Sequence, residues 1–328
     1  MRHHGAMAVR ALDGSADAEV FITRRRKRAG RDGRHPVRLA VLATFVPLLV
    51  VAPLRQNANW SPNTLAGPLG ARIAAKPGSP AALDASKKGV CVWSFRGVTT
   101  ALSESGATWY LTWSTSRQGI VDPRGVQFVP MVRTAANVTP SALAQAERSG
   151  PALLTFNEPD LGSQADMTVA QALSVWPRLM ATKLQLASPA VATGAATPRG
   201  WLDRFMRAAE GHHYRVNFIA VHWYGADFQT AAAVAQLKSY LDSVHRRYEL
   251  PVWVTEYALI NFAPGGPIYA TSAQQAAFVT ASVRMLDSLS FVKRYAWFAL
   301  PAPISGPSSG LYAPGPRATP PGLAFARA

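Results

Sequence analysis

The chain has 328 residues, of which 48% are hydrophobic, and it carries a formal net charge of +16. This length and composition suffice for one large folded domain or for two smaller ones. The single cysteine, Cys91, excludes an intramolecular disulfide and a thiolate metal cluster. Residues 1–38 hold ten Lys or Arg against four Asp or Glu, so +6 of the charge lies in this short segment. Because the densest basic run precedes an apolar segment, we interpret it as targeting and expect no nucleic-acid partner.

An uncharged apolar segment occupies residues 39–54, with Arg34 and Arg38 before it and Arg55 after it. Its length is typical of a signal-peptide core and short for a membrane span of about 20 residues. The basic flank predicts that the chain after Arg55 is exported to the extracellular space or the cell surface. A cleaved signal, an uncleaved membrane anchor and a twin-arginine export signal all remain open, with a buried cytosolic helix as the alternative.

Composition divides the chain into four regions. Residues 1–38 form a basic N-terminal region, and residues 39–54 form the apolar signal or anchor segment. Residues 55–86 are rich in Pro, Gly, Ala and Ser without a regular period, which indicates a disordered linker. We predict that residues 87–328 form the folded domain.

Eight short apolar runs in the last region alternate with segments of helical period, which predicts βαβ units around a parallel sheet. The predicted strands are 89–95, 109–113, 127–131, 152–156, 186–190, 218–222, 252–256 and 294–298. The predicted helices are 169–183, 201–210, 231–248 and 272–289, with a shorter one that begins at 139–141. Eight strands fit a compact (β/α)8 TIM barrel of the α/β class, a single domain with its active site at the C-terminal strand ends. The rival is a doubly wound open sheet, but no Gly-rich phosphate loop follows any strand.

The C-terminal tail after residue 307 allows two interpretations. Its Pro, Gly and Ser content is typical of a disordered segment. Alternatively, Thr319 and Pro320 are suited to begin a last helical turn packed under the barrel.

Two acidic residues end predicted strands: Glu158 follows the fourth run in TFNEPD, and Glu256 ends the seventh in WVTEYAL. Strands four and seven of an eight-stranded barrel face each other across the central opening, so their tips meet over one ligand. Hydrolysis of a glycosidic bond needs one carboxyl group to protonate the leaving oxygen and another to attack or stabilise the anomeric carbon. A retaining mechanism requires a separation of about 5 to 5.5 Å between the two groups. We therefore predict a glycosidase site.

Polar residues accompany the two acids. Asn157 is expected to provide a neutral donor for the sugar 2-hydroxyl. In FIAVHWYG, Tyr224 is expected to hydrogen-bond Glu256, and His222 to contact the sugar or the acid, with a structural histidine as the alternative. We expect no metal, because no second histidine stands at ligand spacing.

Several aromatic residues fall at predicted strand ends. Trp297, next to Phe298 at the eighth strand, is our first candidate for an apolar platform under a sugar ring. Trp93, Trp113 and Trp223 lie near other strand ends and are further candidates for a carbohydrate cleft. Each of them is also suited to a barrel core.

In this order, FNEPD, FIAVHWYG, VWVTEYAL and RYAWF resemble glycoside hydrolase family 128, the family of the alkali-sensitive linkage protein catalytic domain. The similarity runs from about Gly89 to the C-terminus. It implies a retaining (β/α)8 endo-β-1,3-glucanase, with Glu158 as acid/base and Glu256 as nucleophile. It also implies that Asn157, the pair His222 and Tyr224, and the Trp297 platform contact the substrate. One departure is Ala299, where a small residue such as Gly is expected after Phe298.

The resulting hypothesis is a secreted or membrane-tethered monomer that acts on a β-glucan by double displacement without a cofactor. A surface-displayed β-glucan-binding protein without catalysis would use the same aromatic cleft, but would not need both carboxylates. A related enzyme that acts on another β-linked polysaccharide is the third reading.

Overall fold

Nine short strands, each parallel to its neighbours, run through residues 87–328, the part of the chain that the computed structural model describes. They are β1 (Lys88–Cys91), β2 (Trp109–Leu111), β3 (Gln127–Phe128), β4 (Met131–Val132), β5 (Ala152–Asn157), β6 (Gln185–Ala190), β7 (Ile219–Tyr224), β8 (Val252–Ala258) and β11 (Val292–Trp297). The basic region, the apolar segment 39–54 and the linker 55–86 lie outside the described residues, so what we infer for them stays a prediction.

The strand pairings follow the order of the chain. One sheet has the order β3-β2-β1-β11-β8-β7 and the other β4-β5-β6, and a parallel bridge between Ala187 and Phe218 connects β6 to the segment before β7. Strands β3 and β4 come from one predicted run, which Pro130 interrupts because it has no N–H to donate. The predicted strands are thus confirmed, in an arrangement compatible with a (β/α)8 barrel.

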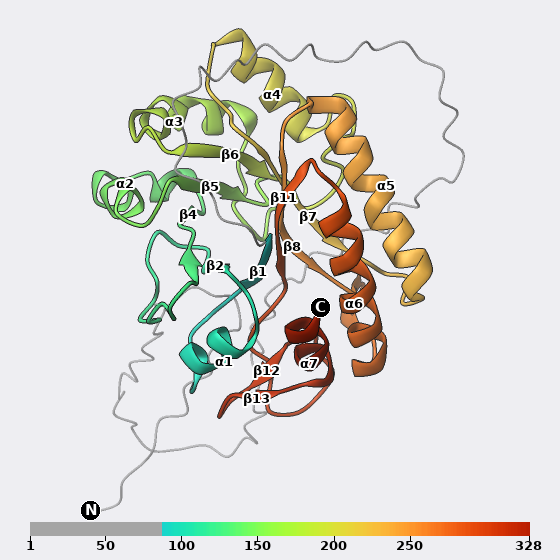
Figure 1. The fold of residues 1–328 in the computed structure, drawn as a ribbon. Coiled ribbons are helices and arrows are strands. Elements are labelled where there is room, and N and C mark those ends of the chain that lie inside the picture. Colours follow the sequence, from blue (N-terminus) through green and yellow to red (C-terminus); the bar gives the residue numbers. More distant parts are fainter. Residues whose placement is uncertain (1–86) are drawn as a thin grey trace, which may run out of the picture. The chain divides into compact units, whose positions relative to one another are not determined.

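Seven α-helices and one 3-10 helix are found within the described residues. They are α1 (Val98–Glu104), η1 (Ala135–Asn137), α2 (Pro140–Glu147), α3 (Val169–Ala181), α4 (Trp201–Gly211), α5 (Thr230–Tyr248), α6 (Ser272–Ser288) and α7 (Pro320–Arg327). Figure 1 shows the seven α-helices around the strands in chain order. The five predicted helices are confirmed. Helix α7 confirms the second interpretation of the tail, in which a helix begins at Thr319 and Pro320. The short helix α1 was not predicted, and no helix separates β2 from β3.

Threonine side chains start four of these helices. Thr139, Thr168, Thr271 and Thr319 each accept a hydrogen bond from a backbone N–H in the first turn of α2, α3, α6 and α7, respectively. In α3 and α6, the side-chain oxygen of a glutamine three residues after the threonine accepts a hydrogen bond from the threonine N–H, which completes a capping box. The helix boundaries are therefore set by local sequence.

Two antiparallel ribbons lie in the connections after β8 and after β11. The ribbon of β9 (Ile260–Ala263) and β10 (Gly266–Tyr269) follows β8 almost directly, and that of β12 (Tyr312–Ala313) and β13 (Arg317–Ala318) precedes α7. Neither ribbon was predicted. The first lies in a segment for which we predict no structure, and the second lies in the Pro- and Gly-rich tail.

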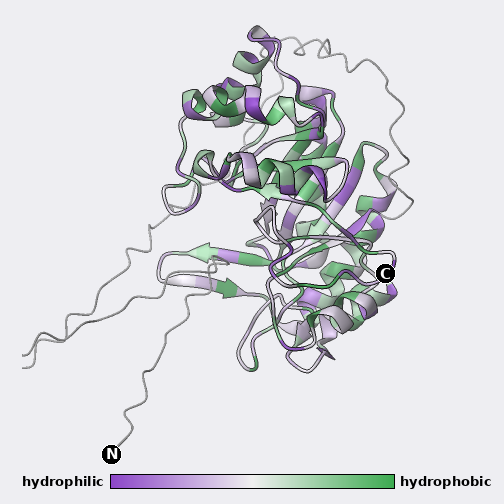
Figure 2. Ribbon diagram, turned by 90° about the vertical axis from the view of Figure 1, so that its left-hand side faces the viewer, coloured by the Kyte–Doolittle hydropathy of each residue, from purple (hydrophilic) through white to green (hydrophobic). Residues whose placement is uncertain are grey.

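Alternate side chains of the strands enter two different hydrophobic clusters. The smaller one, which we call the inner cluster, contains Cys91, Trp109, Leu111, Val129, Met131, Ala152, Leu154, Ala187, Ala190, Phe218, Ala220, Trp253, Ala296 and Ala299. The larger one, the outer cluster, joins the other strand faces to the helices. Figure 2 shows the central strands as mostly hydrophobic, whereas the helices also carry hydrophilic residues. Side chains thus follow the period of two that a strand imposes.

Two lysines fix the start of the domain. The Lys87 ammonium donates to the carbonyls of Asp287 and Leu289, both at 2.9 Å, at the end of α6. The Lys88 ammonium donates to the carbonyls of Phe325 and Ala328, both at 2.8 Å, at the end of α7. Cations are favourable at helix C-termini, where carbonyls lack intrahelical donors. The N-terminus of β1 is thereby joined to two helices close to the C-terminus of the chain.

A buried carboxylate joins α4 to α5. Asp203 has no exposed surface, accepts from the backbone N–H of Arg199 at 2.7 Å, and pairs with the guanidinium groups of Arg207 and Arg247. Burial raises the pKa of Asp203, but the hydrogen bonds from Arg247 and Arg199 outweigh it and hold that pKa below its ordinary value.

We expect Asp203→Asn to lower the free energy of unfolding by about 3 kcal/mol at pH 7, because it leaves the arginines without their buried partner. Since the folded-state pKa is depressed, this contribution is complete above the unfolded pKa of about 3.9 and is lost as the pH falls through the folded-state value. Urea unfolding at several pH values measures it, and the two proteins should converge in acid. Asp242→Asn, which breaks the more exposed Lys238–Asp242 pair, is the control, with an expected effect of about 0.5 kcal/mol. A difference independent of pH would contradict the prediction.

Candidate active site

Both predicted acids lie at C-terminal strand ends, next to irregularities in strand pairing. Glu158 follows β5 directly, and Glu256 lies in β8, close to its C-terminal end. The register shifts along β5 and β6, and again between β7 and β8 just before the partners His222 and Glu256. Glu158 itself has φ of 47°, in the left-handed region. Bulges and unusual backbone angles of this kind redirect side chains near functional sites.

His222 of β7 lies between the two acids. Its Nδ1 is 2.9 Å from Oε1 of Glu158, within hydrogen-bond distance, and its Nε2 is 3.5 Å from Oε1 of Glu256, an ion-pair distance. One ligand atom from each of the three side chains lies within 4.8 Å of the others. All three residues are buried, with at most 8% of their surface exposed. The two carboxyl groups therefore meet as the sequence predicts, and His222 contacts both acids.

Glu256 also receives hydrogen bonds from two other side chains. Trp113, beyond the end of β2, donates its indole N–H to Oε1 at 2.6 Å, and the Tyr224 hydroxyl donates to Oε2. The predicted bond from Tyr224 is confirmed. Burial raises the pKa of Glu256, attraction to His222 lowers it, and repulsion from Glu158 raises it again, so the pKa stays above its ordinary value. The two donors favour the ionised carboxylate.

The charge of His222 depends on the same pair. Burial lowers the pKa of His222, but the negative fields of Glu256 and Glu158 outweigh burial, and the pKa is raised. A histidine held between two carboxylates in this way favours its protonated form.

Asn157, at the last position of β5, is bound by residues that the sequence analysis did not single out. Its Nδ2 donates to Oε1 of Gln164 at 3.2 Å, and Nη2 of Arg133 donates to the same oxygen at 3.0 Å. Within the described domain, Oδ1 of Asn157 has no hydrogen-bond partner. Gln164 lies in the loop between β5 and α3, where no pattern marked it.

Aromatic rings line the site in a connected row. Trp93 contacts Trp113 and Phe298 at centroid distances of 6.3 and 6.2 Å. Phe298 meets Tyr224 edge to face at 5.6 Å, and Tyr224 meets Phe262 of β9 at 5.0 Å. Phe262 is 53% exposed, so the row runs from the carboxylates to the surface. The predicted residues Trp93 and Trp113 belong to it. An aromatic ahead of the Pro-Gly-Gly turn could have signalled the ribbon that carries Phe262.

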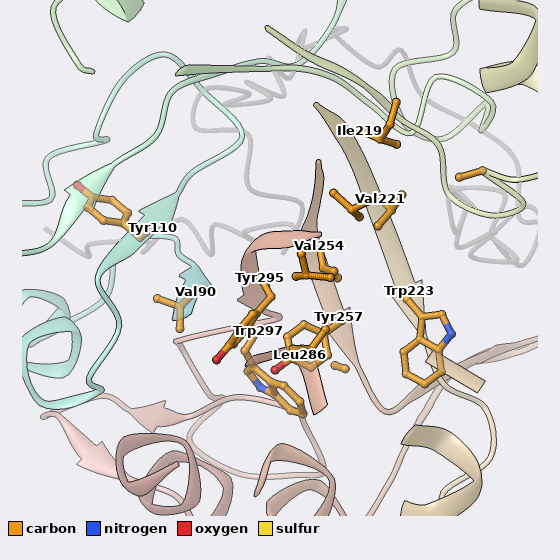
Figure 3. Packing of buried hydrophobic residues seen from close by; sticks show 14 of the residues in the cluster. Val90, Tyr110, Ile219, Val221, Trp223, Val254, Tyr257, Leu286, Tyr295 and Trp297 are labelled. Carbon is orange, nitrogen blue, oxygen red and sulfur yellow. The ribbon is translucent and has the colours of Figure 1, made fainter. Parts of the chain in front are cut away.

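The structure does not bring Trp297 and Trp223 to this row, which corrects two candidates. The Trp297 ring is fully buried in the outer cluster, 5.1 Å from Tyr257, and its indole N–H donates to the Ser309 carbonyl at 2.7 Å. Figure 3 shows Trp297 beside Tyr257 and Tyr295. Trp223 is 9% exposed and stacks on Phe278 of α6. Strand alternation explains both cases: their neighbours in sequence, not they, point to the inner face.

By distance alone, Glu158, His222 and Glu256 could also hold a metal ion. Several of their atoms already have partners, since Nδ1 of His222 bonds Glu158 and both oxygens of Glu256 accept from Trp113 and Tyr224. Nε2 of His222 has no hydrogen-bond partner within the described domain. A metal would have to displace these contacts. No helix within residues 87–328 combines the length and apolar character that a bilayer crossing needs.

Comparison with known proteins agrees with this geometry. A family model described as "Glycosyl hydrolase catalytic core" matches residues 90–313. Alkali-sensitive linkage protein 1 of Schizosaccharomyces pombe is 28% identical to this chain over 201 residues. The match covers 59% of this chain and 34% of that protein, so this chain spans about a third of the length of that relative.

Solved structures match across nearly their whole length. An endo-β-1,3-glucanase of family 128, subgroup I, from Amycolatopsis mediterranei, in complex with laminaritriose, is 49% identical and has a TM-score of 0.71. The match covers 74% of this chain and 99% of that one. A curdlan-specific exo-β-1,3-glucanase of subgroup III from Blastomyces gilchristii is 27% identical, with a TM-score of 0.58, over 74% of this chain and 98% of that one. This chain therefore belongs to glycoside hydrolase family 128.

Proposed function

We propose that the protein is a retaining endo-β-1,3-glucanase whose domain works as a (β/α)8 barrel. The observation that carries the proposal is the meeting of Glu158 and Glu256, with ligand atoms within 4.8 Å, beside an aromatic row that reaches the surface. This spacing fits the short separation of retaining enzymes rather than the about 6.5 to 9.5 Å of inverting ones. The similarity to a solved endo-β-1,3-glucanase at 49% identity supports the linkage and the endo mode.

The first step makes Glu256 the nucleophile. One oxygen of its carboxylate attacks C1 of the sugar, the bond from C1 to the glycosidic oxygen breaks, and that oxygen takes the proton of Glu158. Tyr224 and Trp113 hold Glu256 ionised and aimed, since each donates to a different oxygen. The product is a glycosyl ester on Glu256.

The second step reverses the role of Glu158. As a carboxylate, it takes a proton from water while the water oxygen attacks C1 and Glu256 leaves. The proton taken from water restores the acid form of Glu158, and the hydrogen bond between His222 and Glu158 holds this carboxyl group in place. Two inversions at C1 leave the β configuration unchanged.

The aromatic row gives the substrate its apolar contact. The C–H faces of glucose pack on aromatic rings, and Trp93, Phe298 and Phe262 are partly exposed. Asn157 lies beside the acid, where it can hydrogen-bond a hydroxyl near the cleaved bond.

We propose that the protein acts on an external glucan after export through residues 39–54, which rests on the sequence alone.

Glu158→Ala and Glu256→Ala should separate the two roles. On laminarin, we expect both to lose about 10²- to 10⁴-fold in kcat. On a dinitrophenyl β-laminaribioside, whose leaving group needs no proton, Glu158→Ala should keep much of its activity and be accelerated by azide. Glu256→Ala should remain inactive on this substrate. Release of reducing sugar measures the loss of activity on laminarin. NMR of the first-formed product should show the β anomer.

Glu147→Gln, at an exposed acid of α2, is the control and should match the wild type. Binding of laminarin without hydrolysis by the wild type would instead indicate a glycan-binding protein. Hydrolysis of β-1,4-glucan or mannan in preference to laminarin would change the proposed substrate.

Tyr224→Phe should move the acidic limb of the pH profile of kcat/KM to higher pH. Because burial holds the pKa of Glu256 above its ordinary value, the wild-type limb should already lie above about 4.3. Loss of the hydroxyl that favours the ionised form raises this pKa further, and Glu256 then becomes protonated, and inactive, at higher pH. Tyr257→Phe, the same change at the neighbouring residue of the outer cluster, should leave the limb in place. A shift to lower pH would contradict the assignment.

Dialysis against EDTA should leave the rate of laminarin hydrolysis within about twofold, because the ring and carboxylate atoms of the site serve proton transfer and attack. The rate and the metal content of the dialysed protein are measured together. Loss of activity that a divalent cation restores would show that the cluster of Glu158, His222 and Glu256 works as a metal site.

A further inference from the structure

The orientation of the Asn157 amide is set by a chain of two other side chains. Arg133 follows β4, Gln164 lies in the loop after β5, and Asn157 ends β5. Oε1 of Gln164 accepts from Nη2 of Arg133 at 3.0 Å and from Nδ2 of Asn157 at 3.2 Å. One amide oxygen therefore joins a guanidinium to the residue next to the acid.

The chemistry of the guanidinium fixes both amides. Arginine has only donors, so the atom of Gln164 that faces Arg133 must be its oxygen. That oxygen is an acceptor, so Asn157 must present its nitrogen to it. Without Arg133 and Gln164, the two ends of the Asn157 amide would be nearly equivalent in shape and free to exchange.

This orientation leaves a defined set of free groups on Asn157. The residue is only 3% exposed, and its Oδ1 has no partner within residues 87–328. Buried polar atoms are nearly always hydrogen-bonded, so an orphan oxygen beside a catalytic acid needs an explanation. A sugar hydroxyl both donates and accepts, and it matches an amide that offers Oδ1 and its second N–H.

We infer that Gln164, oriented by Arg133, is a positioning residue that turns the Asn157 amide toward a hydroxyl of the sugar at the cleavage point. The inference rests on the proposed function. Gln164 acts through Asn157, so its loss should affect only substrates that carry the hydroxyl. The 2-hydroxyl is the one to test, because its hydrogen bond strengthens in the transition state of glycoside hydrolysis.

The experiment compares two substrates and two variants in the full chain. The substrates are an aryl β-laminaribioside and its analogue without the 2-hydroxyl on the sugar that is cleaved. Gln164→Met, which keeps the length but not the oxygen, should lower kcat on the first substrate about tenfold, with little change in KM. On the 2-deoxy analogue its kcat should stay within about twofold of the wild type. Gln164→Glu keeps an oxygen for both donors and should restore most of the rate.

Two results would overturn the inference. One is an equal loss by Gln164→Met on both substrates, which indicates a structural role, and the other is no loss on either. If Gln164→Met does not fold, as judged by thermal unfolding, Arg133→Met takes its place. That variant frees the Gln164 amide to turn, and it should show the same loss restricted to the hydroxylated substrate. Gln236→Met, on the exposed face of α5, controls for the substitution itself.

The wild-type rate keeps this test separate from the proposed function. A wild type that cleaves neither laminarin nor the laminaribioside would defeat the proposed function. An active wild type whose Gln164 and Arg133 variants keep full preference for the hydroxylated substrate would defeat only the inference.

Discussion

Two carboxyl groups buried side by side are electrostatically unfavourable, and the structure around the site compensates for this cost. Removal of Glu256 from water disfavours its charged form, and the charge of Glu158 opposes it further. His222 lies between them with one ring nitrogen toward each, and Trp113 and Tyr224 donate to the second acid. These partners come from β7 and from beyond β2, so the site needs several strands in register.

The register in turn depends on where side chains alternate between the inner and the outer cluster. Phe298 belongs to the aromatic row, whereas Trp297, one residue earlier, packs edge to face against Tyr257. A shift by one residue in β11 would exchange these two rings and remove an aromatic contact from the site. Packing of the outer cluster thus affects which side chains reach the site.

The sequence predicted those parts of the fold that local rules control. Apolar runs located the predicted strands, and apolar residues recurring at helical spacing placed α3 and α6 within two residues of their observed bounds. Both acids and the bond from Tyr224 followed from their places at strand ends. The direction of the Trp297 and Trp223 side chains was missed because both were selected for their places at strand ends, whereas regular alternation along β11 and β7 turns them to the outer cluster. Gln164 was missed for a different reason: its role comes from contacts with Arg133 and Asn157 that only the folded loop creates.

The two lysines at the start of β1 bear on how the domain can be linked to a solid support or a fusion partner. Lys87 and Lys88 hold the entry of this strand against the ends of α6 and α7, while Trp93 follows its other end and belongs to the aromatic row. Lys87 therefore lies on the side of the domain away from the carboxylates. A resin, fusion partner or surface linked upstream would therefore leave the catalytic face open to an insoluble polymer, and force applied through that link would load the lysine contacts before the active site.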